Sequence, residues 1–362
     1  MPDRDREATA SEAGLLRHGA ASLPPVTIDD YNAELRDEEG FIGDRASNRA
    51  FRTILEEWRE KLRRLGEDPL GDEDSREISK RKLDAVLAEG APEAAGLVHG
   101  AIEEFAQEFV TVAQRLLKLK SWRGTERIVV GGGLRDSRVG ELAIGRAAVL
   151  LRAGGHDISL MPIRHHPDEA GLIGTAHLAP SWLFAGHGAI LGVDIGGTNM
   201  RAGIVKLNLK KSPDLAAACV EEAVLWKHRD DRPSRTEAVE RLVEMLRGLM
   251  KHAAKEKLRL APFIGIGCPG LIGADGAIER GGQNLPGGNW ESSRFNLCET
   301  LREAIPEMDG HDTVALMHND AVVQGLSEAP FMRDVRRWGV LTIGTGLGNA
   351  RFTNRKSEEA AD

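Results

Sequence analysis

The sequence has few cysteines, no long apolar run and no excess of positive charge. Its three cysteines, Cys219, Cys268 and Cys298, are too widely spaced for a zinc knuckle and odd in number for a disulfide framework. No run of about eighteen apolar residues occurs, and residues 1–19 lack the apolar core of a signal peptide. The formal net charge of -8 disfavours binding to nucleic-acid backbones. We therefore expect a soluble, cytoplasmic protein with no zinc site, no membrane partner and no nucleic-acid partner.

Two common nucleotide-binding patterns are absent or incomplete. No GxxxxGK[ST] pattern occurs, which excludes a Walker-type site. Gly265, Gly267 and Gly270 satisfy the dinucleotide pattern GxGxxG, but Pro269 and a loop-like stretch follow. A dinucleotide site needs a helix there to receive the pyrophosphate. We therefore reject both classes of site.

Glycine, in contrast, is abundant. The 41 glycines are concentrated in four clusters, which predicts several places where the backbone closely approaches another group. With 362 residues, 41% of them hydrophobic, the chain is long enough for two domains that each bury a core.

Apolar spacing predicts an α/β protein. Residues 1–48 show no sustained periodicity and are interpreted as a flexible arm or irregular cover. The segment 190–207 is typical of a hairpin, in which two strands flank a glycine turn. Periodicity predicts helices over 51–65, 98–119, 139–151 and 233–250 and from residue 319, and strands over 127–130, 158–161, 262–266, 313–317 and 339–343.

The hairpin turn forms the first candidate phosphate loop, with Asp194, Gly196, Gly197, Thr198 and Arg201. Backbone N–H groups in a turn without side chains can face an anion. The Thr198 hydroxyl can donate to a phosphate, and Asp194 can hold a hydrated magnesium ion. The alternative is a plain hairpin, but a buried aspartate beside two glycines is unfavourable without a partner.

A second glycine loop follows an apolar strand near the end of the sequence. It contains Gly344, Thr345 and Gly346. An ordinary glycine-rich turn is the alternative for this loop taken alone. Together with the first loop it predicts a grip on a triphosphate from two sides.

A candidate general base lies between the two loops, in the tripeptide His318, Asn319 and Asp320. These residues end a predicted strand and begin a helix. A carboxylate at this position can accept the proton of an attacking hydroxyl, so Asp320 is the candidate. The alternative is a helix N-cap, where Asn and Asp are favoured.

The glycine run Gly131, Gly132 and Gly133 follows another strand and precedes a helix. Its backbone could lie against an adenine or a ribose. A tight turn is the alternative interpretation of this run.

Five ordered motifs resemble the ROK family (repressor, open reading frame, kinase), which includes bacterial glucokinases. In chain order they are GVDIGGTNMRAG, GIGCPGLIG, QNLPGGNW, HND and TIGTGLGNA. The resemblance implies a two-domain actin-like ATPase (ribonuclease H-like) fold with an interdomain cleft. It also implies a sugar kinase that uses ATP and Mg²⁺, and it favours a homodimer.

The resemblance also implies roles for individual residues. Asp320 would be the catalytic base, and Gly270, Asn284 and Asn319 would contact the sugar, together with Asp320. Asp194 would hold Mg²⁺ through water. The ATP contacts would come from the two phosphate loops and the glycine run: Asp194, Gly196, Gly197, Thr198, Arg201, Gly344, Thr345, Gly346, Gly131, Gly132 and Gly133.

The order of segments differs from the family pattern. An adenosine-side motif and a terminal helix normally follow the second phosphate loop, whereas similar segments here lie at Thr125–Leu134 and Asp168–Leu178. We infer a circular permutation, which is tolerated where termini lie at exposed loops. The expected layout is the arm at 1–48, nucleotide-side segments at 49–178 and 336–362, a linker at 179–190 and a sugar-side domain at 187–335.

Two family motifs are missing. Neither the E-x-G-H sugar contacts nor the C-x-C-G-x-x-G-C zinc motif is present. Asp44 and Glu39 are candidates for replacement sugar contacts, with solvated loop acids as the alternative. A non-catalytic sugar-binding regulatory protein of the same fold is therefore the alternative function.

Overall fold

The computed structural model describes residues 17–38 and 40–355. The chain divides into two compact α/β units. In the described part, no helix is both long and apolar enough to cross a membrane. Unit 1 comprises Met1–Asn32, Asp168–Arg336 and Phe352–Asp362, and unit 2 comprises Ala33–Pro167 and Arg337–Arg351.

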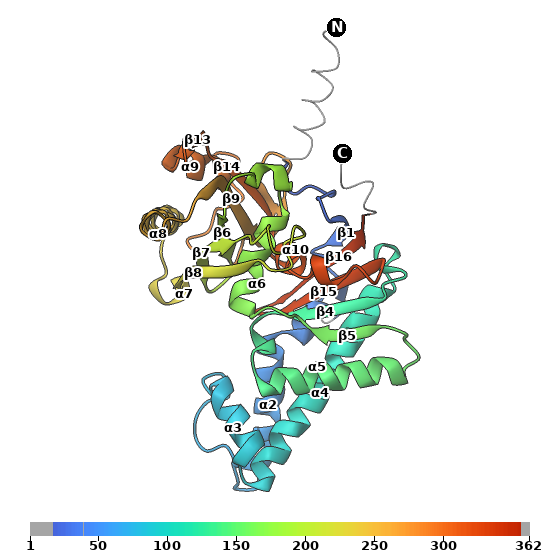
Figure 1. Cartoon of the computed structure of the whole chain (residues 1–362). Coiled ribbons are helices and arrows are strands. Elements are labelled where there is room, and N and C mark those ends of the chain that lie inside the picture. The colour runs from blue at the N-terminus through green and yellow to red at the C-terminus, as the bar shows by residue number, and fades with distance from the viewer. Residues whose placement is uncertain (1–16, 39, 356–362) are drawn as a thin grey trace. The chain divides into compact units, whose positions relative to one another are not determined.

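Unit 1 contains a five-stranded mixed sheet of order β14-β9-β6-β7-β8 (Figure 1). The two central strands β6 and β9 are completely buried, which explains their unbroken apolar sequences. β14, β9 and β6 run parallel, whereas β6, β7 and β8 form an antiparallel meander. The strands are β6 (Ala189–Ile195), β7 (Met200–Lys206), β8 (Cys219–Trp226), β9 (Leu260–Cys268) and β14 (Val314–Asn319).

Amphipathic helices cover one face of this sheet. The helix α8 (Arg235–Lys255) begins with a capping box in which Ser234 and Glu237 satisfy each other's backbone N–H groups. Its apolar stripe enters a core that also contains α9 (Leu297–Ala304) and inward-facing strand residues. This burial fixes which strand residues point to the opposite face.

Aligned glycines allow a helical segment to lie directly on that opposite face. Gly203, Gly192 and Gly265 are in register on three neighbouring strands. A Cβ atom added at Gly265 would lie 2.5 Å from the Thr175 Cβ, and one at Gly203 would lie 2.7 Å from the Leu172 Cδ1. These glycines therefore accommodate α6 (Pro167–Gly174) and η4 (Thr175–His177). The helix α10 (Asp320–Leu326) contacts β9 as well.

Unit 2 contains parallel strands from distant parts of the sequence. β15 (Arg337–Ile343) pairs with β4 (Arg127–Gly131), and β4 pairs with β5 (Ser159–Pro162). The strand β16 (Leu347–Asn354) neighbours β15 and continues into unit 1, where it adjoins β1 (Val26–Tyr31). In the part of β16 that belongs to unit 1, Thr353 Oγ1 donates to the Asp29 carboxylate at 2.7 Å.

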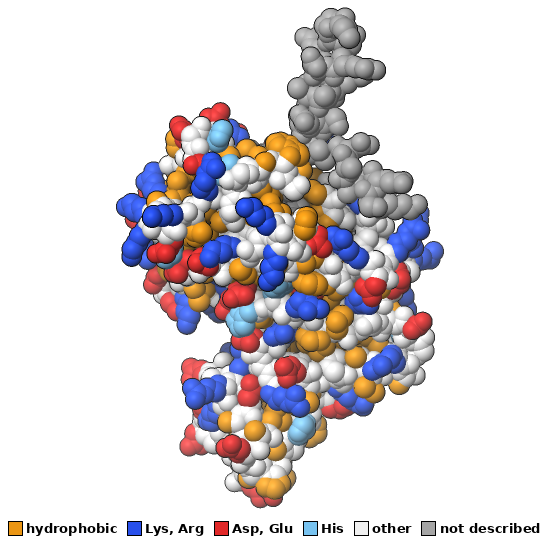
Figure 2. Space-filling model, viewed as in Figure 1, with side chains coloured by type: hydrophobic (Ala, Val, Ile, Leu, Met, Phe, Trp, Pro, Cys, Tyr) orange, Lys and Arg blue, Asp and Glu red, His pale blue; other side chains and the backbone are white. Residues whose placement is uncertain are grey.

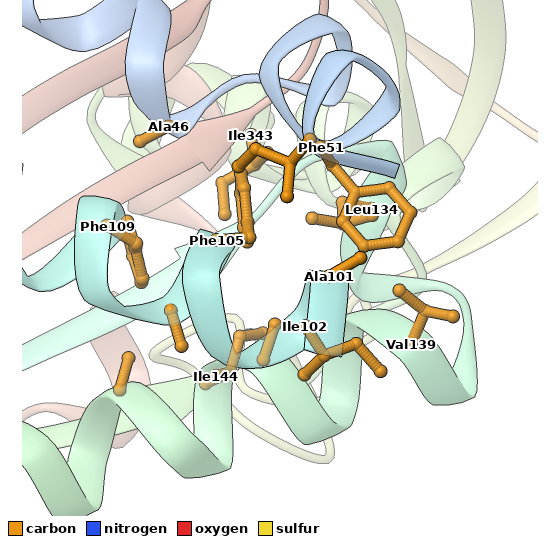
Figure 3. Close-up of a cluster of buried hydrophobic side chains, with 14 of the residues drawn as sticks. Ala46, Phe51, Ala101, Ile102, Phe105, Phe109, Leu134, Val139, Ile144 and Ile343 are labelled. Carbon is orange, nitrogen blue, oxygen red and sulfur yellow. The ribbon is translucent and has the colours of Figure 1, made fainter. Parts of the chain in front are cut away.

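Helices pack on the unit 2 sheet around a phenylalanine cluster. Phe51 of α2 (Asn48–Arg63) meets Phe105 of α4 (Pro92–Leu117) edge to face at 5.8 Å between ring centroids (Figure 3). Ile343 at the end of β15 and Ile144 of α5 (Arg138–Ala153) belong to the same core. The apolar stripe of α4 is thus buried against α2 and α5.

Short elements complete the described chain. They are β2 (Arg36–Asp37), β3 (Gly40–Phe41), η1 (Ile42–Ala46), α3 (Lys80–Glu89), η2 (Lys120–Trp122), η3 (Gly133–Arg135), η5 (Ser181–Phe184), α7 (His228–Asp231), β10 (Leu271–Ile272), β11 (Ile278–Arg280), β12 (Glu307–Met308), β13 (His311–Asp312) and η6 (Ala329–Phe331).

The structure confirms the predicted hairpin and the predicted helices and strands, with shifts at their ends. It adds α3, in which Leu83 is buried and Val86 and Leu87 pack partly buried against the same core. Of the segment interpreted as an arm or irregular cover, residues 17–48 hold β1, β2, β3 and η1, and residues 1–16 lie outside the described part.

Positive and negative side chains are interspersed on the surface in Figure 2.

We predict that Gly174→Ala destabilises unit 1 by about 1–3 kcal/mol. An added Cβ would lie 1.7 Å from the Val323 carbonyl oxygen, so α6 or α10 must move. Gly248→Ala in the exposed interior of α8 is the matched control, because nothing lies within 4 Å of its Cβ position. Helix propensity predicts a gain of up to about 1 kcal/mol for the control. Urea unfolding measures both values, and equal effects of the two changes would contradict the close packing.

Candidate functional site

The carboxyl ends of the parallel strands in unit 1 bring the predicted acids together. Asp194 of β6 is in register with Gly267 of β9, and Gly267 is in register with His318 of β14. Asp320 follows the end of β14 and is the first residue of α10. In open α/β sheets, ligands bind at this edge, where the strands end. Asp194 and Asp320 therefore flank the end of β9.

The Asp194 carboxylate is enclosed by a helix and an arginine. Its residue is 7% exposed, and Arg201 Nη1 donates to Oδ2 at 3.2 Å. Arg201 also binds Asp168 at the beginning of α6. A Cβ added at Gly171 of α6 would lie 2.6 Å from the Asp194 Cγ, so only glycine leaves room for this carboxylate. Burial raises the pKa of Asp194, whereas Arg201 opposes the shift.

Asp320 lies beside this group and is only partly exposed. Burial, and then the negative charge of Asp194, raise the pKa of Asp320 to about 7. Its Oδ1 accepts a 2.9 Å hydrogen bond from the Ala321 N–H. A carboxyl group with a pKa near neutral pH is suited to accept a proton and release it again.

Asn319 adopts the N-cap role that was the alternative interpretation of this tripeptide. Its Oδ1 accepts from the N–H groups of Ala321 at 3.0 Å and Val322 at 3.3 Å. Its Nδ2 donates to the Gly270 carbonyl oxygen at 3.0 Å. Gly270 has a φ of +108° and no room for a Cβ, which would lie 2.3 Å from the Arg280 carbonyl oxygen. The amide thus fixes the beginning of α10, and sugar contact by Asn319 and Gly270 stays a prediction.

The first predicted phosphate loop is a tight turn supported by α7. Gly196 N–H donates to the Asn199 carbonyl at 2.8 Å. His228, which is 3% exposed, has its Nε2 2.9 Å from the Gly196 carbonyl oxygen and donates to it. The Arg229 N–H donates to the Thr198 carbonyl at 3.2 Å. Sequence analysis missed His228, because the apolar pattern around it gives no signal for a contact across 32 positions.

Asn284 lies next to the same loop. The position of a Cβ added at Gly197 would be 3.3 Å from the Asn284 Cβ. The Asn284 residue is exposed, so its amide is open to solvent beside the turn. Unit 1 thus brings together Asp194, Gly196, Gly197, Thr198, Arg201, Gly270, Asn284, Asn319 and Asp320.

The other predicted glycine segments adjoin one another in unit 2. Gly131 is in register with Thr342, two residues before Gly344. Gly132 has a φ of +83°, and its added Cβ would lie 2.4 Å from the Ile343 carbonyl oxygen. Residues from opposite ends of the sequence therefore form one pair of neighbouring loops, 131–133 and 344–346.

Two further residues support these loops. The Asn48 N–H at the beginning of α2 donates to the Gly344 carbonyl at 3.0 Å. Lys80 Nζ donates to the Gly133 carbonyl oxygen at 2.5 Å. Thr345 and Gly346 are exposed. Sequence analysis missed both supporting residues, because their partners lie far along the chain.

The structure describes one of the two candidate replacement sugar contacts. Asp44 is an exposed residue of η1 in unit 2. Glu39 lies outside the described residues. Asp168–Leu178, which the sequence analysis placed with the nucleotide-side segments, lies in unit 1 on the glycine row.

The donor set of unit 1 fits a magnesium ion bound with waters. Asp194 offers carboxylate oxygens, the ligands that Mg²⁺ prefers, next to Asp320. The charge of Asp194 disfavours ionisation of Asp320, and a nearby cation would relieve this repulsion. In the described ranges, no group of three or more His, Cys, Asp and Glu side chains is placed to hold a metal alone. Magnesium would therefore take further ligands from water and phosphate.

Comparison with known proteins finds similarity to several solved structures. No family model and no curated protein sequence matches the chain. A "putative sugar kinase" from Cytophaga hutchinsonii is similar over 46% of this chain and 48% of its own, with 23% identity and a TM-score of 0.35. The ROK hexokinase from Thermus thermophilus is similar over 44% and 45%, with 21% identity and a TM-score of 0.30. The similar region thus spans less than half of either solved chain. The site residues themselves carry the functional proposal.

We predict that Asp320→Asn raises the melting temperature at pH 8 but leaves it nearly unchanged at pH 4. A carboxyl group whose pKa rises on folding stabilises the folded state below its ordinary pKa, and that stabilisation is lost as pH rises through about 7. Asparagine removes this titration. In a domain of the size of unit 1, a change of 1 kcal/mol in the free energy of unfolding shifts the melting temperature by about 2–4 °C.

The measurement is thermal unfolding from pH 4 to pH 8 with a chelator present. Asp312→Asn changes an exposed acid of β13 and serves as the control. A pH-independent difference between Asp320→Asn and the wild type would contradict the raised pKa.

Proposed function

We propose that this protein transfers the γ-phosphoryl group of ATP to a sugar hydroxyl, with Asp320 as the general base. The observation that carries the proposal is the position of Asp320 beside Asp194 at the carboxyl ends of parallel strands, with a pKa raised to about 7. The five ordered motifs that resemble the ROK family support a sugar as the acceptor.

The proposed roles follow from the surroundings of each residue. Asp320 accepts the proton as the sugar oxygen attacks phosphorus, and the bond from phosphorus to the bridging oxygen of ADP breaks. Asn284 is open to solvent beside the first loop and is proposed to bind a sugar hydroxyl. Asn319 and Gly270 would contact the sugar only through atoms left free by their mutual hydrogen bond.

The nucleotide is assigned to the glycine loops. Gly196, Gly197 and Thr198, with Arg201 nearby, are proposed to face the phosphates. In unit 2, Gly344, Thr345 and Gly346 would hold phosphates, and the run at 131–133 would lie against the adenosine. Asp194 would hold magnesium through water, and the ion would supply neutralisation of the charge that develops on the phosphoryl oxygens.

We expect Asp320→Ala to lower kcat by about 10²–10⁴-fold, because the proton of the attacking hydroxyl loses its acceptor. The KM for ATP should stay nearly unchanged, since the loops are intact. A coupled assay of ADP release across a panel of hexoses measures both constants, with Asp312→Ala as the control. A variant that keeps wild-type kcat on the best hexose would rule out Asp320 as the base.

The same panel separates the two candidate functions. A wild-type protein that binds a hexose in calorimetry but releases no ADP with any member of the panel would favour a non-catalytic, sugar-binding regulatory protein. The missing E-x-G-H motif motivates this alternative.

We also propose that the chain is a circular permutant of the ROK order. The parallel pairing of β4 with β15 supports this proposal. β15 leads into the second phosphate loop, and β4 belongs to the segment that follows this loop in the family order. The Arg355 N–H donates to the Pro25 carbonyl at 3.2 Å, so segments near both ends are neighbours within unit 1.

A rearranged chain tests this proposal. Residues 186–362 followed directly by residues 1–185 should fold, with a melting temperature within a few degrees of the original. The new ends fall beside Trp182, which is 50% exposed, and exposed loops tolerate new termini. Circular dichroism and thermal unfolding check the outcome, and a rearranged chain that stays unfolded would contradict the proposed junction.

A further inference from the structure

A buried histidine precedes the cap and base residues. His318 is 1% exposed and belongs to β14, the edge strand of the unit 1 sheet. The Asn319 N–H donates to its Nδ1 at 2.7 Å. The proton of the neutral ring is therefore on Nε2, which lies 3.2 Å from the Ala20 carbonyl oxygen and donates to it. Burial lowers the pKa of His318 to about 4, so the ring is neutral near pH 7.

Residues 18–20, the segment that contains Ala20, bind the outer edge of β14. The Gly19 N–H donates to the Met317 carbonyl at 3.0 Å, and the Met317 N–H donates to His18 Nδ1 at 3.2 Å. Both backbone groups of this edge residue are thus satisfied by residues near the beginning of the chain. The fit is close, because a Cβ added at Gly19 would lie 2.1 Å from the Ile272 carbonyl oxygen.

Tyr31 adds a contact from the far end of the same segment. Its ring meets the His318 ring edge to face, with centroids 5.1 Å apart. The backbone of Ile272, which follows Gly270 and Leu271, lies near the Tyr31 hydroxyl and opposes the rise in its pKa that burial causes. The segment therefore contacts both stretches of chain that hold Asn319.

We infer that His18 and Gly19, bound to Met317, together with Ala20 and Tyr31, bound to His318, form a brace that positions Asp320 for proton transfer. This inference rests on the proposed function. The direction of the Asp320 carboxylate depends on the backbone at residues 319–320. Within the described residues, that backbone is held by the His318 ring, by the cap of α10 and by Gly270.

The hydrogen bonds distinguish a brace from simple packing. An apolar side chain could fill the volume of the imidazole, but it would leave the Asn319 N–H and the Ala20 carbonyl oxygen without these partners. His318 is thus a positioning residue that acts through Asn319 and Asp320. A displacement of about 1 Å at a reacting group can lower the rate about 100-fold.

Three variants of His318 separate its two hydrogen bonds. His318→Asn keeps an acceptor near Nδ1 for the Asn319 N–H, and His318→Gln keeps a donor near Nε2 for Ala20. His318→Leu keeps neither. His99→Asn, at an exposed position of α4, is the matched control.

The first readout is the split between kcat and KM. We expect kcat to fall about 10–100-fold in His318→Leu and less in His318→Asn and His318→Gln, while the KM for ATP changes less than about twofold. Unchanged kcat per folded molecule in His318→Leu would overturn the inference.

The second readout is independent of activity. Hydrogen exchange at the amides of Asn319, Ala321 and Val322 should be faster in His318→Leu and partly restored in His318→Asn. Wild-type exchange in folded His318→Leu would show that the ring only packs, and would overturn the brace. If the wild type phosphorylates no hexose but exchange changes as expected, the proposed function fails and the structural brace stands.

Discussion

Two neighbouring carboxylates at the end of a sheet, one buried and one partly exposed, are the constraint on which the rest of unit 1 depends. Among the described residues, Asp194 pairs with Arg201, which also binds Asp168. Burial, and then the negative charge of Asp194, disfavour ionisation of Asp320 and raise its pKa. A structure selected for stability alone would gain by replacing one acid. Two acids at this edge are consistent with a site that binds a cation and moves a proton.

Glycines make this burial possible in two different ways. In the sheet, Gly203, Gly192 and Gly265 let the backbone of α6 and η4 approach closely, and Gly171 of α6 leaves the space that the Asp194 carboxylate occupies. In the loops, glycines at 196–197 form a turn whose carbonyls are bound by α7. The glycine clusters in the sequence thus mix packing positions with candidate ligand positions. Gly265 and Gly267, which imitate a dinucleotide pattern, belong to the packing group, and β10 rather than a helix follows β9.

The sequence predicted what depends on local pattern. Alternation and helical periodicity located the hairpin, the central strands and the α10 start, and these place Asp194 and Asp320 at strand ends. Contacts between distant residues were not predictable in this way. The His228 bond to Gly196, the Lys80 bond to Gly133 and the His318 bond to Ala20 join segments whose separate patterns carry no sign of each other. The N-cap role of Asn319 was open in the sequence, because the same residue type serves caps and sugar contacts.

Composition and periodicity did not predict the ordered structure of the segment near the beginning of the chain. Residues 17–32 show no sustained apolar periodicity. They cover the edge of a sheet instead of forming a core of their own. An edge strand leaves backbone N–H and C=O groups that need partners, and β14 obtains them from His18 and Gly19. These partners are 299 positions apart in sequence, yet the entropy of closing a loop grows only slowly with its length. This contact joins His18 and Gly19 to the strand that ends beside Asp320. Order in this segment therefore comes from the sheet edge it covers rather than from its own sequence.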